Sequence, residues 1–122
     1  NLEKNILFLG YRNDVPKLLK IADLAVSTSR QEGLPVNLME AMYMGLPIVA
    51  TDCRGNRDLV INDVNGFLVK EKKSKKRYIQ LCIEKLENDK NLGRIFGKNS
   101  KKFVEKYTIK NVRDDMKKIY FK

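Results

Sequence analysis

The chain has 122 residues, of which 43% are hydrophobic and 33% charged, so it suits one folded domain rather than a disordered tail. It contains no histidine, which excludes histidine-based catalytic triads, histidine general bases and histidine-containing zinc sites. The net charge of +10 favours anionic partners. No apolar run approaches the roughly 18–20 residues that a membrane-spanning helix needs.

The first 70 residues alternate short apolar runs with amphipathic stretches. Four apolar runs are interpreted as strands: Asn5–Gly10, Leu24–Ser27, Ile48–Thr51 and Gly66–Val69. Between them, helices are expected after Asp14, from Pro35 to about Met44, and over Arg54–Ile61. Continuous apolar strands separated by helices are typical of a parallel sheet that is covered on both faces. We therefore expect an α/β fold with four short parallel strands.

The residues after Lys70 contain no proline and read as helices. Apolar residues recur at helical spacing in three stretches: Tyr78–Leu86, Ile95–Tyr107 and Val112–Tyr120. We expect a helical C-terminal section whose last helix covers about residues 111–122. In that helix Val112, Met116 and Ile119 share one apolar face.

The loop after the second predicted strand, together with the helix that follows it, is the candidate ligand site. Glu32 and Gly33 lie in the loop, and Glu40 lies in the second turn of the helix. The first backbone amides of a helix have no partner within it, so those of Val36 and Asn37 can bind a phosphate or diphosphate. The two carboxylates can accept hydrogen bonds from sugar hydroxyls. Ligands of open α/β sheets bind at the carboxyl ends of strands, so this pattern permits a nucleotide sugar.

A longer motif surrounds the two glutamates, which have seven residues between them. Its other parts are Phe8-x-Gly10, Ala22-Asp23, Ala41-Met42, Gly45-Leu46-Pro47, Ile48–Thr51, Gly55, Asp58 and Asn65-Gly66. Together, over about residues 5–70, they resemble the donor-binding half of retaining glycosyltransferases with the GT-B fold, family 4 or group 1. Members of this family build bacterial polysaccharides and glycolipids.

The resemblance implies a catalytic role for Glu32, which would contact hydroxyls of the donor sugar near the reacting anomeric carbon. The donor-binding residues that it implies are Glu40 at the ribose, the amides of Gly33 and Leu34 at the sugar, those of Val36 and Asn37 at the diphosphate, and Tyr11 at the base. Pro35 stands where some relatives carry glycine. Because proline has no N–H, one sugar or phosphate contact is expected to be absent.

The implied fold is a Rossmann-like parallel sheet that forms the C-terminal half of a GT-B enzyme. The implied reaction moves a hexosyl-type sugar from a nucleotide-sugar to a polysaccharide, oligosaccharide or glycolipid acceptor, with retention of configuration. We expect a UDP-sugar as donor, and neither a cofactor nor a metal, because amides and basic side chains stabilise the leaving diphosphate. Asp114 and Asp115 are interpreted as solvated or salt-bridged.

The resemblance also implies parts that this sequence does not match. These are an acceptor-binding N-terminal domain and the first strand-loop-helix of the donor domain, which carries a diphosphate-clamping arginine and lysine. We therefore expect residues 1–122 to be most of a donor-binding domain that is inactive alone. In such enzymes the last helix often packs toward the other domain.

Other interpretations remain beside this one. The positive charge admits a nucleic-acid-binding module, and the same fold could serve a non-catalytic interaction domain. We expect no nucleic acid, because the basic residues are mostly lysines interleaved with acids. The tract Lys70–Arg77 is either a solvated face or a contact with anionic lipid. The segment Gly55-Asn56-Arg57 is either a helix start near the donor or a surface turn. The chain has only two cysteines, Cys53 and Cys82, and is rich in lysine, so it is interpreted as cytoplasmic and reduced, with peripheral contact at the inner membrane face as an option.

Overall fold

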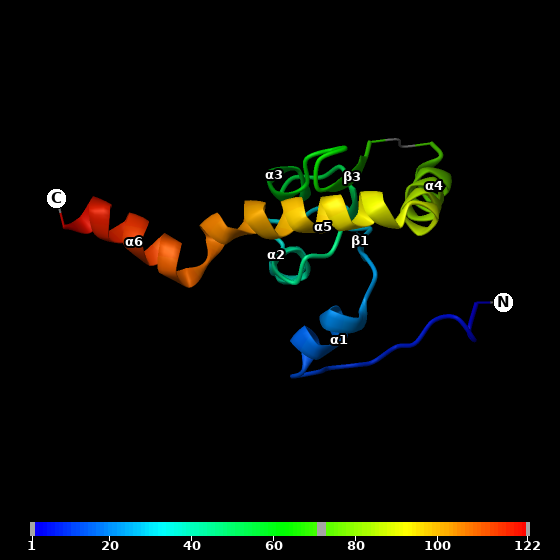
Figure 1. Ribbon diagram of the computed structural model, residues 1–122, viewed down its shortest axis with the longest axis horizontal. Coiled ribbons are helices and arrows are strands. Elements are labelled where there is room, and N and C mark those ends of the chain that lie inside the picture. The colour runs from blue at the N-terminus through cyan, green and yellow to red at the C-terminus, as the bar shows by residue number, and fades with distance from the viewer. Residues whose placement is uncertain (1, 71–72, 122) are drawn as a thin grey trace.

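The computed structural model describes residues 2–70 and 73–121. It contains a parallel sheet with helices packed on both faces (Figure 1). The strands lie in the order β1 (Ala25–Ser27), β2 (Ile48–Thr51) and β3 (Gly66–Val69). The α/β class and the last three of the predicted strands are thus confirmed.

The central strand β2 shows why its sequence is a continuous apolar run. Its register pairs Ile48 with Ala25 of β1 and with Gly66 of β3. Ile48 and Ala50 belong to the hydrophobic cluster on one face of the sheet, whereas Val49 belongs to the cluster on the other face. All residues of β2 are buried, so its first three positions are apolar, and the polar Thr51 at its end is buried with its hydroxyl hydrogen-bonded.

The helices of the first half are α1 (Val15–Ile21), α2 (Val36–Tyr43) and α3 (Asn56–Leu59). The sequence predicted their starts well: α1 follows Asp14, and α2 begins directly after Pro35, which is its N-cap. Helix α3 is shorter than the predicted Arg54–Ile61. Buried side chains of α2 and α3 pack in the same cluster, on one face of the sheet.

The C-terminal section is helical, as predicted. Its elements are α4 (Lys75–Asn88), α5 (Lys90–Val104), the 3-10 helix η1 (Glu105–Tyr107) and α6 (Ile109–Tyr120). Leu86 of α4 and Phe96 of α5 pack with Phe67 and Val69 of β3 on the second face of the sheet. The start of α5 is fixed by Asp89, whose side chain accepts a hydrogen bond of 2.9 Å from the amide of Leu92.

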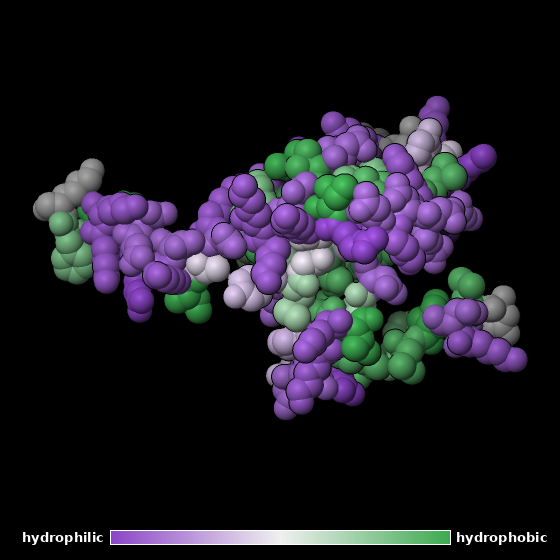
Figure 2. All heavy atoms as spheres, in the orientation of Figure 1, coloured by the Kyte–Doolittle hydropathy of each residue, from purple (hydrophilic) through white to green (hydrophobic). Residues whose placement is uncertain are grey.

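The prediction that Asn5–Gly10 forms a strand was wrong. This segment has no regular structure, it lies apart from the sheet, and its apolar residues are at the surface (Figures 1 and 2). The side chain of Phe8, for example, is 92% exposed. A strand is stable only where a neighbouring strand pairs its backbone and other elements cover its side chains. The described residues supply neither for this segment.

Helix α6 extends away from the sheet (Figure 1). The apolar face that the sequence predicted for it is exposed, including Val112, Met116 and Ile119. Among the described residues, no helix has the length and apolar character needed to span a membrane.

Candidate functional site

The candidate site is built at the end of the sheet where the carboxyl ends of the parallel strands lie together. Because the strands are parallel, Ser27 at the end of β1 and Thr51 at the end of β2 lie at the same edge. The loop of residues 28–35 leaves β1 here, and residues 52–55 leave β2 here. The exposed Lys70 follows the end of β3.

The carboxylate of Glu32 is held within its own loop. The hydroxyl of Ser29 donates a hydrogen bond of 2.6 Å to Oε1 of Glu32. The hydroxyl of Ser27 donates a longer bond of 3.4 Å to Oγ of Ser29. The Thr51 hydroxyl donates to the backbone carbonyl of Ser29, which ties this loop to the end of β2. Glu32 is half-buried, so its carboxylate is partly screened from solvent and remains reachable by a ligand.

The loop after β2 is packed directly on this first loop. Gly55 has a φ of +84°, and a Cβ atom built on it would overlap the carbonyl oxygen of Gly33 and lie 3.0 Å from Cβ of Glu32. The buried Asn56 side chain donates a hydrogen bond of 2.9 Å to the carbonyl of Thr51. The segment Gly55-Asn56-Arg57 is thus the start of a helix and not a surface turn, and it supports the Glu32 loop.

The N-terminus of α2 is open to solvent beside this loop. Its N-cap Pro35 makes no side-chain cap bond, and the amides of Val36 and Asn37 have no partner within the helix. Val36 is 60% exposed and Asn37 is exposed as well. Amides in this position, together with the helix dipole, stabilise an anion.

Glu40 lies in the following turn of α2 and is exposed. The sequence placed it close to the apolar face of the helix, and its neighbours Ala41 and Met42 are indeed buried. The Glu40 side chain itself points to solvent, so packing gives no reason for a carboxylate at this position.

The structure therefore brings most of the predicted site residues together. Glu32, Gly33, Leu34, Val36 and Asn37 form one continuous loop-helix junction, because they are adjacent in the chain. Tyr11 is different. It is 97% exposed and lies in the segment before α1, and within the described residues its side chain makes no hydrogen bond or ring contact with the junction.

Sequence reasoning missed the residues that hold this junction in place. Ser29, Thr51 and Asn56 carry the hydrogen bonds, and the available signal was their polar side chains at or just after the carboxyl ends of β1 and β2. It also missed the exposed cation Arg54, which directly precedes Gly55. Arg57, by contrast, is paired with Asp52.

Two other features carry charge. Asp115 pairs with Lys118 at 2.8 Å, as interpreted from the sequence, and this pairing raises the pKa of Lys118. In the tract Lys70–Arg77, Glu71 and Lys72 lie outside the described residues. Within the described parts of the chain, no cluster of three or more metal-ligating side chains occurs.

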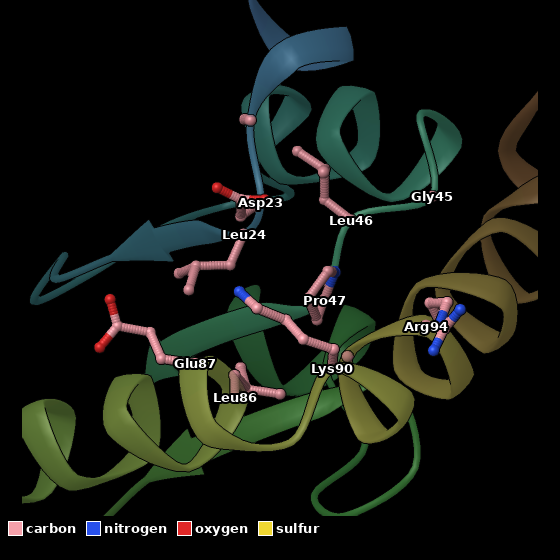
Figure 3. Close-up of a pocket in the computed structure, with 11 residues that line it drawn as sticks. Asp23, Leu24, Gly45, Leu46, Pro47, Leu86, Glu87, Lys90 and Arg94 are labelled. Atoms are coloured by element: carbon pink, nitrogen blue, oxygen red, sulfur yellow. The ribbon is translucent and has the colours of Figure 1, made fainter.

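A groove lies at the opposite end of the sheet, where the strands begin. It has a volume of about 700 Å³. One side is formed by the residues that lead into β1 and β2, and the other side by the junction of α4 with α5 (Figure 3). Its charged lining residues are Asp23, Glu87, Lys90 and Arg94. Because this groove is at the amino ends of the strands, it is separate from the predicted site.

The sequence matches the family described as Glycosyl transferases group 1 over residues 1–103. One relative is UDP-Gal:alpha-D-GlcNAc-diphosphoundecaprenol alpha-1,3-galactosyltransferase of Escherichia coli. It is 37% identical over 121 residues, which are 98% of this chain and 30% of that enzyme. The chain thus spans less than a third of the length of the curated relatives that it matches first.

Solved structures share the fold. The structure of Anabaena Alr3699/HepE in complex with UDP and glucose superposes with a TM-score of 0.86 at 27% identity, over 97% of this chain and 32% of that chain. The C-terminal domain of LpcC, a glycosyl transferase group 1 family protein from Francisella tularensis, superposes with a TM-score of 0.70 at 28% identity. That match covers 85% of this chain and 53% of the LpcC domain. The fold is that of GT-B glycosyltransferases, as the resemblance implied.

Proposed function

Because this chain belongs to the Glycosyl transferases group 1 family, we propose that it binds the nucleotide-sugar donor of a retaining, hexosyl-type glycosyltransferase. One observation carries this proposal: a carboxylate held by hydrogen bonds stands in the loop that leads into an exposed, uncapped helix N-terminus. A nucleotide sugar has matching groups, since its sugar hydroxyls suit the carboxylate and its diphosphate suits the helix amides.

In this proposal, Glu32 accepts hydrogen bonds from the donor sugar close to the reacting carbon, beside the amides of Gly33 and Leu34. The amides of Val36 and Asn37 bind the diphosphate. Glu40 binds the ribose, and Tyr11 is the residue expected at the base. An exposed carboxylate that has no packing role, such as that of Glu40, is consistent with binding a ligand hydroxyl.

The proposed reaction breaks the bond between the anomeric carbon and the diphosphate oxygen, the acceptor hydroxyl oxygen bonds to the same face of that carbon, and the hydroxyl proton passes to the leaving diphosphate. Negative charge builds up on the leaving diphosphate, and the α2 amides stabilise this charge without a metal or another cofactor. The exposed Arg54 is a further cation near this edge of the sheet. Acceptor binding is assigned to a separate domain, so this chain alone is expected to bind donor without transferring sugar.

We propose UDP as the nucleotide and a sugar or lipid-linked sugar as the acceptor. The name of the Escherichia coli relative specifies a UDP-linked galactose and a diphosphoundecaprenol-linked acceptor, and the Anabaena structure holds UDP. An enzyme that acts on such an acceptor would work in the cytoplasm at the inner membrane face. There the lysine-rich surface of this chain would contact anionic lipid.

Calorimetric titration of the chain with UDP, ADP, GDP, UDP-glucose and UDP-galactose tests the proposal. We expect a preference for the uridine nucleotides. Binding of single-stranded or duplex nucleic acid that is tight and falls steeply with salt, without a nucleotide preference, would instead support the nucleic-acid module. Absence of any nucleotide binding would contradict the donor-site assignment.

A further inference from the structure

We propose that Ser29 is a positioning residue for Glu32, and that it determines how strongly the site binds the sugar part of the donor. This inference rests on the proposed function, in which Glu32 contacts that sugar. The Ser29 hydroxyl would act only through the glutamate, without touching the ligand.

The first step of the argument is the geometry of the hydrogen bond. At 2.6 Å, the bond from Oγ of Ser29 to Oε1 of Glu32 is in the short range that a hydroxyl reaches with an ionised acceptor. The Ser27 hydroxyl lies 3.4 Å from Oγ of Ser29, which makes it at most a weak donor to Ser29. In the described chain, no residue bonds to the other oxygen, Oε2, which leaves it available for a ligand hydroxyl.

The second step is that Ser29 is itself fixed at its backbone. Its carbonyl accepts a hydrogen bond from Thr51, a residue with only 1% exposure at the end of β2. The Thr51 carbonyl in turn accepts a bond from the buried Asn56 at the start of α3. Ser29 thus connects the strand ends to the Glu32 carboxylate and fixes the orientation of that half-buried side chain. A preoriented acceptor binds a hydroxyl with a smaller loss of side-chain entropy.

The effect is expected on the sugar and not on the nucleotide. The amides of Val36 and Asn37 belong to α2, and their positions do not depend on the Ser29 hydroxyl. Removing this hydroxyl should therefore weaken the binding of UDP-glucose or UDP-galactose and leave the binding of UDP unchanged. A general loosening of the loop would weaken all three.

The test is a calorimetric double-mutant cycle on the chain, with UDP, UDP-glucose and UDP-galactose as ligands. We expect Ser29→Ala to lower the affinity for the tighter of the two sugar nucleotides about tenfold, with less than a twofold change for UDP. Ser29→Thr, which keeps the hydroxyl, should restore most of the loss. In a Glu32→Ala background, which removes both acceptor oxygens, Ser29→Ala should have almost no further effect, because the hydroxyl acts through the carboxylate.

Thr28→Ala is the matched control, since Thr28 is an exposed residue of the same loop and its removal should change neither affinity. The inference is overturned if Ser29→Ala leaves sugar-nucleotide affinity unchanged, if it weakens UDP equally, or if its effect persists in the Glu32→Ala background. It is also overturned if the wild-type chain binds UDP but gains nothing from the sugar, and in that case the proposed nucleotide site stands. A wild-type chain that binds none of the ligands contradicts the proposed function itself.

Discussion

The backbone of Gly55 packs on the carbonyl oxygen of Gly33, and this contact joins the loops that follow β1 and β2. Its consequence is that the position of Glu32 depends on a residue more than 20 positions away in the sequence. Gly55 also has a positive φ of 84°. Two independent physical reasons, backbone conformation and the space available, therefore require glycine at this position.

We predict that Gly55→Ala destabilises the chain by at least about 2 kcal/mol, because it adds overpacking to a left-handed backbone. The same change should displace the Glu32 loop and abolish the gain in affinity from the donor sugar. Urea denaturation measures the stability, and titration with UDP-glucose measures the binding.

Gly45→Ala is the control for the backbone effect alone. Gly45 also has a positive φ, of 78°, but the nearest atom to a Cβ there is 3.9 Å away. We expect this variant to lose about 1 kcal/mol and to bind UDP-glucose normally. Equal losses for the two alanine variants would show that the contact with Gly33 contributes nothing.

Helix α5 contacts the α2–β2 turn through a second glycine. A Cβ on Gly97 would overlap the carbonyl oxygen of Gly45, so we predict that Gly97→Ala costs about 1–3 kcal/mol. One turn earlier in α5, a Cβ on Gly93 would lie 4.0 Å from Cγ of Pro47, which is an ordinary contact. Gly93→Ala should therefore stabilise the chain by about 0.5–1 kcal/mol through helix propensity. Melting temperatures that shift in the same direction for both variants would contradict this prediction.

The buried Asn65 fixes the segment between α3 and β3. Its side chain donates 2.8 Å to the carbonyl of Leu59 and accepts 2.8 Å from the amide of Ile61, while its carbonyl accepts 3.0 Å from Ser100. We predict that Asn65→Ala costs about 2–4 kcal/mol in urea denaturation, because it removes the side-chain partners of the buried Leu59 carbonyl and the partly buried Ile61 amide. Asn99→Ala removes a single, partly exposed bond and should cost less than about 1 kcal/mol.

The sequence predicted the fold where local and tertiary signals agree. The run Ile48–Thr51 is apolar because both faces of its strand are buried, and Pro35 marks the start of α2. The run Asn5–Gly10 has the same local pattern but remains exposed. Hydropathy shows that a segment could be buried, and only the tertiary structure shows whether a partner covers it.

The candidate site was predictable only where its residues are adjacent in the chain. Glu32 and Val36 are brought together by one loop and the first turn of one helix, which the pattern indicates. The contact of Gly55 with Gly33 and the bond from Thr51 to Ser29 depend on how two loops meet across neighbouring strands. No spacing rule within one segment encodes such a contact.

The exposed carboxylate of Glu40 allows binding to be separated from stability. We predict that Glu40→Gln changes the free energy of unfolding by less than about 0.5 kcal/mol, since the side chain is exposed. The same change should lower UDP affinity about tenfold, because it removes a charged acceptor for the ribose. Glu87→Gln, in the groove at the opposite end of the sheet, is the control and should bind UDP as the wild type does. Unchanged UDP affinity for Glu40→Gln would remove Glu40 from the proposed site.

The pair formed by Arg12 and Asp14, just before α1, gives a prediction about pH. Nε of Arg12 donates a hydrogen bond of 2.7 Å to Oδ1 of Asp14, and Nη2 donates one of 2.7 Å to Oδ2. These bonds lower the pKa of the Asp14 carboxyl and raise the pKa of Arg12. A carboxyl whose pKa is lowered in the folded state stabilises that state at pH values above the carboxyl's ordinary pKa. The contribution is lost as the pH falls through the lowered value.

We therefore expect the Asp14 carboxyl, followed by NMR titration, to protonate at a lower pH than an ordinary aspartate. In Arg12→Ala the midpoint should rise toward the ordinary value. Because both side chains are exposed, the variant should unfold like the wild type near neutral pH, where a solvent-screened pair contributes little. Lys17→Ala removes a nearby positive charge whose side chain makes no bond to the Asp14 carboxyl, keeps the backbone bond of Lys17 to the Asp14 carbonyl, and should leave the midpoint in place. If both variants shift it equally, the direct hydrogen bonds are not its cause.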